Sequence, residues 1–221
     1  MARSSRQSSG WVVGGILVLI ATAAASAAGA PPRPTPVRAL PRVTLISDSV
    51  AAAIPFEIGP KTILAEGIDL FLEPGQGRRL GGENPVGAIA PPTALQLIPM
   101  LGRRLGETVI MDVGYNDLSD QYAANMEAAL AELSSAGVKR VLWATLHLSP
   151  AHIGNQIMND AIAAVAVHHP ELTIVDWNAY ASGHPEWFQA DQVHLMGDGT
   201  RELARLFHSS LVKLGIPARR S

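Results

Sequence analysis

The sequence predicts an α/β fold in which a parallel β-sheet is covered by helices on both faces. Short runs of β-branched and apolar residues alternate along the chain with segments of helical periodicity. Strands that alternate with helices are joined by right-handed crossovers, and such crossovers make the sheet parallel. In sheets of this kind, sites form at the carboxyl ends of the strands. We therefore expect the functional residues to follow the predicted strands.

Five segments have the composition of buried strands. They are 43–46, 108–113, 141–146, 172–177 and, more weakly, 68–72. The segment 108–113, with the sequence TVIMDV, lies between Gly106 and Gly114. Short runs that are rich in Val, Ile and Thr and bounded by glycine are typical of strands.

Two helices follow from apolar periodicity. In the first, apolar residues recur three or four positions apart over 122–133, with Ser119 or Asp120 able to cap its start and Gly137 its end. The second has an apolar face over 203–214, and the glycine and proline that follow it predict a stop.

Composition excludes several functional classes. The chain has 221 residues, of which 48% are hydrophobic and 16% charged, with a formal net charge of -2. A basic nucleic-acid-binding surface is therefore not expected, and the apolar content argues against disorder. The sequence contains no cysteine, which excludes disulfide scaffolds, thiolate nucleophiles and cysteine-ligated zinc.

Residues 1–30 have the pattern of an export signal. Arg3 and Arg6 form a positive start, 11–25 is apolar, and 25–30 contains small residues in A-x-A cleavage patterns. Two interpretations are open, a cleaved signal peptide or an uncleaved signal anchor, because about 20 apolar residues just span a bilayer. Either one predicts a secreted or cell-envelope protein whose contact with a membrane is limited to this anchor.

Five prolines in 31–41 predict a stiff, extended linker, because proline fixes φ and lacks a backbone N–H. The folded domain is expected to span 42–221, which leaves no length for a second domain. Without 1–30, the 17 basic residues become 15 against 19 acidic ones, a net charge of about -4. We expect this domain to be a monomer.

Four polar or glycine-rich segments carry the candidate chemistry. They are SDSV at 47–50, EPGQGRR at 73–79, GYND at 114–117 and DQVH at 191–194. In this order, and at these predicted strand ends, they resemble the blocks of the SGNH (GDSL-type) hydrolase family. The resemblance covers about residues 42–215. It implies a three-layer α/β/α sandwich around a flavodoxin-like, parallel five-stranded sheet.

The resemblance also implies a Ser-His-Asp triad and an oxyanion hole. Ser49 is the expected nucleophile, His194 the base that takes its proton, and Asp191 the acid that orients the imidazole. The expected oxyanion donors are the backbone N–H groups of Ser49 and Gly77 and the side-chain amide of Asn116. Neither a cofactor nor a metal is implied.

Each candidate also has a structural interpretation. Ser49 can cap the helix after the first strand. Asn116 can be a left-handed residue or a turn residue after Gly114, with Asp117 as a helix cap. Asp191 and His194 can be a surface pair that caps the last helix. The residues with metal-ligand chemistry lack helical ligand spacing, and we expect no site from them; they are His147, His152, Asp112 and Asp117.

Two further segments, 175–178 and 184–195, are similar to the secreted SGNH domains of cell-wall and polysaccharide O-acetyltransferases. We therefore expect a secreted or envelope-associated serine esterase that acts on O-acetyl or short acyl esters of a small molecule or a glycan. The alternatives are an O-acetyltransferase acting on a cell-wall glycan and a catalytically idle glycan-binding envelope protein. A lipase is disfavoured because the chain lacks a G-x-S-x-G elbow.

Overall fold

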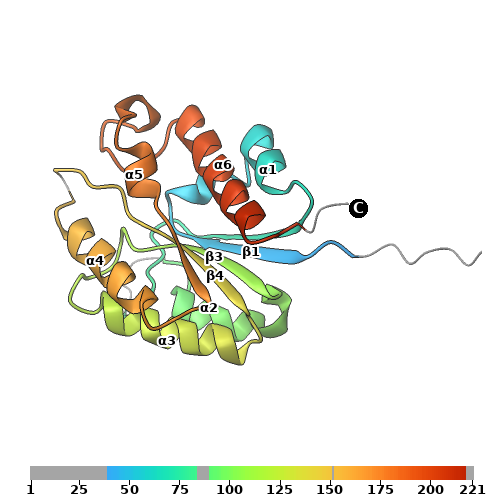
Figure 1. Cartoon of the computed structure of the whole chain (residues 1–221). Coiled ribbons are helices and arrows are strands. Elements are labelled where there is room, and N and C mark those ends of the chain that lie inside the picture. The colour runs from blue at the N-terminus through green and yellow to red at the C-terminus, as the bar shows by residue number, and fades with distance from the viewer. Residues whose placement is uncertain (1–38, 84–89, 151, 218–221) are drawn as a thin grey trace, which may run out of the picture. The chain divides into compact units, whose positions relative to one another are not determined.

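A five-stranded parallel sheet organises the described part of the chain, which comprises residues 39–83, 90–150 and 152–217 of a computed structural model (Figure 1). The strands are β1 (Arg42–Ser47), β2 (Asp69–Pro74), β3 (Thr108–Asp112), β4 (Arg140–Ala144) and β5 (Leu172–Val175). Their order is β2-β1-β3-β4-β5, and every neighbouring pair is parallel. This is the flavodoxin-like order, and it confirms the predicted fold class.

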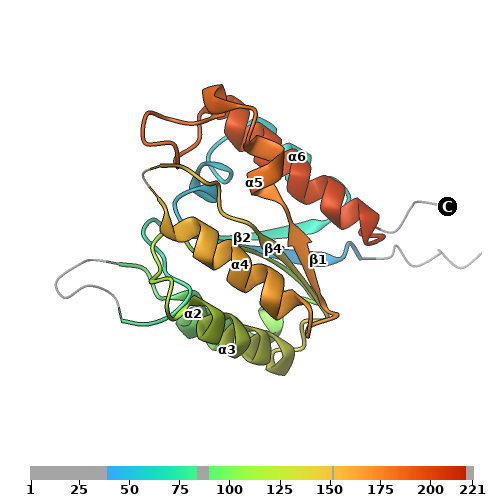
Figure 2. The same ribbon diagram turned by 60° about the vertical axis from the view of Figure 1, so that its left-hand side comes forward.

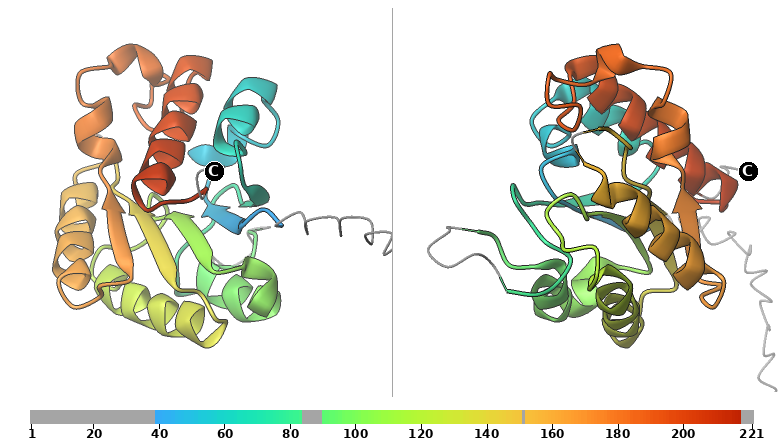
Figure 3. Two further views of the ribbon diagram at one scale, coloured as in Figure 1. Left: turned by 45° about the vertical axis from the view of Figure 1, so that its right-hand side comes forward. Right: turned by 90° about the vertical axis from the view of Figure 1, so that its left-hand side faces the viewer.

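Helices cover both faces of the sheet, which makes three layers. One face carries α1 (Ile58–Leu64), α5 (Trp177–Ala181) and α6 (Gly197–Lys213), and the other carries α2 (Ala94–Leu101), α3 (Tyr122–Ser135) and α4 (Gly154–Ala166). Short 3-10 helices lie at η1 (Ala51–Ala53), η2 (Gly102–Leu105) and η3 (Pro185–Trp187). Figure 2 and Figure 3 show the sheet between the two helical layers.

The middles of the central strands are largely apolar because both of their faces are buried. Val109 and Met111 of β3 pack with α2, α3 and α4, whereas Ile110 between them packs with α6. In β4, Trp143 faces the first of these helical layers and Leu142 the second. Successive side chains of a strand point to opposite faces, so a strand covered on both sides has apolar residues at successive positions.

The predicted end of α3 is found, whereas its predicted N-terminal cap is wrong. Gly137 follows α3 with φ 95°, and Val138 N donates to Leu133 O at 3.0 Å, as in a Schellman motif. However, neither Ser119 nor Asp120 caps the start of α3. The N-cap is Gln121, which makes no side-chain cap hydrogen bond. The chain forms a turn here, in which Gln121 N donates to Leu118 O, and this turn places residues 119 and 120 ahead of the helix.

The predicted signal segment, 1–30, lies outside the described residues, as does most of the predicted linker, 31–41. Pro41, at the end of that linker, accepts a hydrogen bond from Asp69 N at 2.9 Å, so the chain joins the sheet directly after it. No helix in the described ranges is long and apolar enough to cross a membrane.

We predict that Phe207→Ala destabilises the protein by about 3–5 kcal/mol, because the ring is fully buried between α6 and the sheet and its removal leaves a cavity. Val212→Ala on the same helix is the control, since Val212 is 50% exposed and should change stability by less than about 0.5 kcal/mol. Urea denaturation of both variants checks this. Equal losses in the two variants would contradict the assignment of the buried face.

Candidate active site

Ser49 lies in a turn just past the carboxyl end of β1, the strand between β2 and β3. Asp48, which is fully buried, holds this turn from beneath. Its carboxylate accepts hydrogen bonds from Val50 N at 2.9 Å and from Tyr115 N at 3.3 Å. Its own N–H donates to Asp112 O at 2.9 Å. The Ser49 turn is therefore tied to the end of β3.

The fold brings His194 and Asp191 to Ser49 across 145 residues. Ser49 Oγ lies 3.0 Å from His194 Nε2, and His194 Nδ1 lies 2.6 Å from Asp191 Oδ2. The hydrogen bond from His194 lowers the pKa of Asp191 to about 2, so its carboxylate is ionised and only accepts. Nδ1 therefore carries the proton. Nε2 is then the acceptor, and the Ser49 hydroxyl donates to it.

A hairpin-like loop over residues 188–195, called the acid-base loop below, sets the positions of Asp191 and His194. Phe188 and Leu195 form an antiparallel bridge at its base, and Gln189 N donates to His194 O at 2.7 Å. At its tip, Asp191 Oδ1 accepts the N–H groups of Val193 and His194, both at 3.0 Å. The loop thus fixes both oxygens of the carboxylate. Phe188, at the base of the loop, is buried and stacks on His147 with ring centroids 4.1 Å apart.

The structure contradicts the capping interpretations. The helix after β1 has Val50 as its N-cap, with no side-chain cap hydrogen bond, so Ser49 does not cap it. The N-cap of α6 is Met196, again without a side-chain bond, so Asp191 and His194 do not cap that helix.

Asn116 lies in a turn, in which Asp117 N donates to Gly114 O at 2.9 Å, so this part of the structural interpretation is confirmed. Asn116 is not left-handed, because Gln192 is the one non-glycine residue with positive φ in the described ranges. Asp117 accepts from Leu80 N at 2.8 Å and from Gly81 N at 3.3 Å instead of capping α3. It therefore ties the end of β3 to the glycine-rich segment after β2, and burial raises its pKa to about 6.

The three expected oxyanion donors lie on neighbouring strand ends. Gly77 has φ 72° in the turn after β2, a backbone conformation that favours glycine. Asn116 Nδ2 donates to Arg78 O at 3.1 Å, which joins the end of β3 to this turn. Within the described residues, the N–H groups of Ser49 and Gly77 donate no hydrogen bond. Both are available to a ligand.

Arg78 is a part of the site that the sequence analysis did not single out. Its side chain is buried, and its guanidinium donates to three backbone carbonyls: Ser47 O at 3.2 Å, Pro74 O at 3.4 Å and Pro92 O at 2.7 Å. No carboxylate of the described residues forms a salt bridge with it. Burial lowers its pKa, while the charges of Glu73 and Asp48 act in the opposite direction.

The sequence did contain a signal for Arg78. Gly75 stands three residues before it, and a Cβ at Gly75 would lie 2.5 Å from Arg78 Nε. A tight glycine turn next to an arginine leaves room for the guanidinium to fold back onto the backbone. The acceptors themselves come from separate segments and had no local pattern.

Two buried carboxyl groups lie beneath the Ser49 turn. Burial raises the pKa of Asp48 to about 7, and it also raises the pKa of Asp112, on which the charge of Asp48 acts in the same direction. Asp112 Oδ2 has no hydrogen-bond partner. Burial thus favours the protonated form of both acids. Asp191 differs from them, because its side chain is 46% exposed.

The residues considered for a metal lie in different environments. His147 stacks on Phe188, His152 Nδ1 lies 3.2 Å from Ser149 Oγ, and Asp112 is buried under the nucleophile turn. Of the residues that the structure describes, no three His, Cys, Asp or Glu side chains are placed to hold a metal ion.

Comparison with solved structures places this arrangement among known folds. The C-terminal catalytic domain of peptidoglycan O-acetyltransferase A (OatA) from Streptococcus pneumoniae aligns with a TM-score of 0.58 and 18% identity, over 80% of this chain and 94% of that chain. TesA aligns with a TM-score of 0.61 and 19% identity, over 78% of this chain and 99% of its own. The chain has the SGNH hydrolase fold.

Other SGNH hydrolase structures agree. Est24, a carbohydrate acetylesterase from Sinorhizobium meliloti, aligns with a TM-score of 0.60 and 13% identity, over 79% of this chain and 99% of that chain. Among curated proteins, the putative peptidoglycan O-acetyltransferase YrhL of Bacillus subtilis (strain 168) is 39% identical over 49 residues. That match covers 22% of this chain and only 8% of YrhL. No family model matches the chain.

We predict that Arg78→Met destabilises this SGNH fold by about 1–3 kcal/mol, because it leaves buried carbonyls without donors. The matched control is Arg79→Met, since the Arg79 guanidinium donates to Glu83 O at an exposed position and should matter by less than about 0.5 kcal/mol. Urea denaturation followed by circular dichroism measures both. If Arg78→Met were no less stable than Arg79→Met, the three carbonyl contacts would have no structural importance.

Proposed function

We propose that this protein is a secreted or envelope-associated serine esterase or acyltransferase that acts on O-acetyl or short acyl esters. The observation that carries the proposal is the hydrogen-bonded series Asp191, His194 and Ser49, with distances of 2.6 and 3.0 Å. A serine hydroxyl is a weak nucleophile until a base within hydrogen-bond reach takes its proton. Here that base is an imidazole whose other nitrogen is held by an ionised carboxylate.

In the proposed reaction, Ser49 Oγ attacks the ester carbonyl carbon while its proton moves to His194 Nε2. The negative oxygen that forms accepts hydrogen bonds from the N–H groups of Ser49 and Gly77 and from the amide of Asn116, and each such donor contributes about 3 kcal/mol. His194 then gives its proton to the leaving alcohol, and an acyl-serine remains. Water then attacks the acyl carbon while His194 Nε2 takes a proton from that water. The bond between the acyl carbon and Ser49 Oγ breaks, His194 returns the proton to Ser49 Oγ, and the free acid leaves.

If a sugar hydroxyl replaces water in the second step, the same site transfers the acyl group. The names of OatA, YrhL and Est24 support ester chemistry on cell-wall or carbohydrate hydroxyls. The export-signal pattern of residues 1–30 supports a location outside the cytoplasm. A catalytically idle, glycan-binding protein is the alternative to an esterase or an acyltransferase. Unlike them, it would have no reactive serine.

We predict that Ser49→Ala lowers kcat on 4-nitrophenyl acetate by at least about 10³-fold, because no other hydroxyl occupies the nucleophile position. Ser209→Ala, on the exposed side of α6, is the control and should leave turnover unchanged. In the wild type, a serine-directed phosphonate should modify Ser49, as located by mass spectrometry. Turnover of Ser49→Ala at the wild-type rate would exclude this mechanism, and an unlabelled, inactive wild type would favour the idle binding protein.

A second prediction concerns pH. The value of kcat/KM should fall on acidification, because a protonated His194 cannot take the proton of Ser49. Asp191 is not the cause of this loss, since its pKa of about 2 keeps the carboxylate ionised throughout. Asp191→Asn should lower kcat on the order of 10⁴-fold, as loss of the orienting acid does in such triads. A wild-type profile that stays flat across the ordinary titration range of histidine would contradict the assignment of His194.

A further inference from the structure

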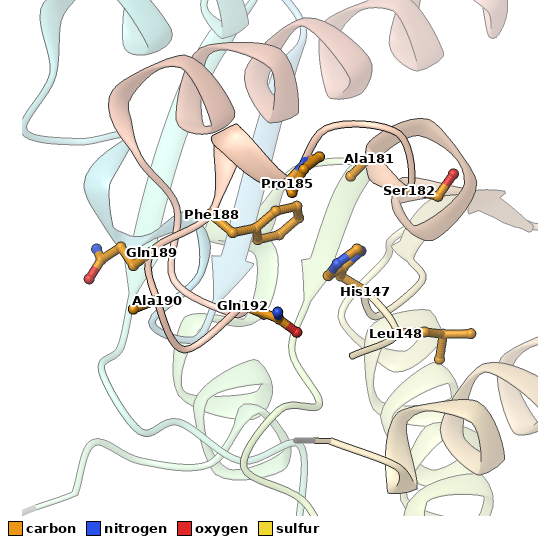
Figure 4. Close-up of a pocket in the computed structure, with 9 residues that line it drawn as sticks. All are labelled: His147, Leu148, Ala181, Ser182, Pro185, Phe188, Gln189, Ala190 and Gln192. Carbon is orange, nitrogen blue, oxygen red and sulfur yellow. The ribbon is translucent and has the colours of Figure 1, made fainter. Parts of the chain in front are cut away.

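A pocket of about 380 Å³ is lined in part by the loop that carries Asp191 and His194 (Figure 4). The acid-base loop contributes Gln189 and Gln192, which stand on either side of Asp191 in the chain. His147 comes from the segment after β4, and Ser182 and Phe188 come from the region between α5 and the loop. The volume is in the range of small-molecule binding pockets.

Hydrogen bonds between side chains and backbone atoms hold the walls of this pocket in place. His147 N donates to Tyr115 Oη at 2.6 Å, and His147 O accepts from Asn155 Nδ2 at 2.8 Å. The imidazole lies parallel to the ring of Phe188, with an interplanar angle of 17°. Gln189 Nε2 donates to Leu195 O at 3.2 Å, which holds the opposite wall. The pocket is therefore formed before any ligand enters.

The position of the pocket relates it to one part of an ester. Its described lining comes from the His194 side of the site and includes neither Gly77 nor Asn116, the proposed oxyanion donors. In the proposed reaction, His194 protonates the oxygen of the leaving alcohol, so the group attached to that oxygen must extend from the His194 side. The pocket consequently lies on the alcohol side of the scissile bond.

The lining is uncharged and combines polar with apolar side chains. None of the described lining residues is Asp, Glu, Lys or Arg, and burial lowers the pKa of His147, which favours its neutral form. Polar groups come from Ser182 and the two glutamines, while Leu148 and Pro185 are among the apolar residues. A group that presents several hydroxyls at its edge and C–H bonds on its face fits such a lining. Sugars have this character.

Gln192 has the most direct route to a ligand. Its backbone is left-handed, with φ 59°, and its N–H donates to Gln189 O at 2.9 Å. Its side-chain amide has no hydrogen-bond partner within the described ranges. Figure 4 shows this side chain on the side of the pocket that faces His147 and Leu148. Unusual backbone conformations of this kind concentrate at functional sites.

We propose that this pocket binds the uncharged sugar whose hydroxyl carries the ester, and that Gln192 is a specificity residue for it. The proposal rests on the proposed function, since the alcohol side is defined by the role of His194. The alternative is that the pocket binds the acyl chain. In that case, substitutions in the pocket would change the preference between short and long acyl groups.

The test compares two acetate esters of primary alcohols, 6-O-acetylglucose and ethyl acetate, by acetate release from the full chain. The acyl group is the same and the leaving groups have similar chemistry, so the ratio of the two kcat/KM values isolates binding of the sugar. Gln192→Ala should lower the ratio, sugar ester over ethyl ester, about tenfold, the effect of one lost hydrogen bond. Ser182→Trp should lower it as well by filling the pocket.

The matched control is Gln156→Ala, because this exposed glutamine on α4 hydrogen-bonds only to Asp160. The control should leave the ratio unchanged. Binding is measured separately on Ser49→Ala by saturation-transfer NMR with 6-O-acetylglucose, and adding Gln192→Ala should abolish the transfer.

The outcomes separate the two proposals. An active wild type whose ratio is unchanged in both pocket variants would overturn the sugar pocket and leave the esterase proposal standing. Variants that change the preference between acetate and butyrate, with the ratio unchanged, would assign the pocket to the acyl chain and likewise overturn it. A wild type that releases no acetate, but whose Ser49→Ala form binds the sugar through Gln192, would overturn the esterase and support the pocket.

Discussion

Two buried polar side chains, Asp48 and Arg78, hold together the three strand ends on which the site depends. Asp48 accepts backbone N–H groups from the Ser49 turn and from the start of the segment after β3. Arg78 donates to carbonyls at the ends of β1 and β2, and its own carbonyl accepts from Asn116. One residue therefore satisfies donors and the other satisfies acceptors. Parallel strands bring these segments to one edge, and the two side chains fix the loops there.

The remaining half of the site is built locally. Asp191 and His194 stand three residues apart on one loop, so their hydrogen bond is local. The only long-range contact that the series of hydrogen bonds then needs is the one between this loop and Ser49. Packing of α6 sets that approach. Met196 N, at the start of α6, donates to Trp187 O at 2.8 Å. A Cβ at Gly199 would lie 2.3 Å from the same carbonyl, so only glycine allows the helix to lie this close.

Much of this arrangement followed from the sequence. All five strands lie where composition predicted them, with ends that differ by no more than two residues, because successive apolar and β-branched residues mark the parts of a strand that are covered by helices. The order of the motifs at strand ends anticipated which residues the fold brings together at Ser49. The start of α3 was missed because an intervening turn, rather than side-chain capping, begins that helix.

Several contacts that escaped prediction join segments that are distant in sequence. Arg78 reaches Ser47, 31 residues earlier, and Pro92, 14 residues later. Asp117 bonds to Leu80, 37 residues away. A local pattern such as the glycine before Arg78 can indicate that a side chain folds back, but it does not identify distant partners. The pocket was not predicted for the same reason, because its walls come from the segment after β4, from α5 and from the acid-base loop.

Environment separates the carboxyl groups of the site into two roles. Asp191 accepts a hydrogen bond from the imidazole N–H of His194, which lowers the pKa of Asp191 to about 2. Its side chain is about half exposed, so the carboxylate stays charged beside His194. Asp48 is excluded from water, and burial raises its pKa to about 7 despite the N–H groups that it accepts. The ionised carboxylate of Asp191 thus faces His194, where it favours the proton on Nδ1 and leaves Nε2 free to accept. Asp48, beneath the Ser49 turn, instead accepts backbone N–H groups, and its raised pKa reduces the negative charge close to Ser49.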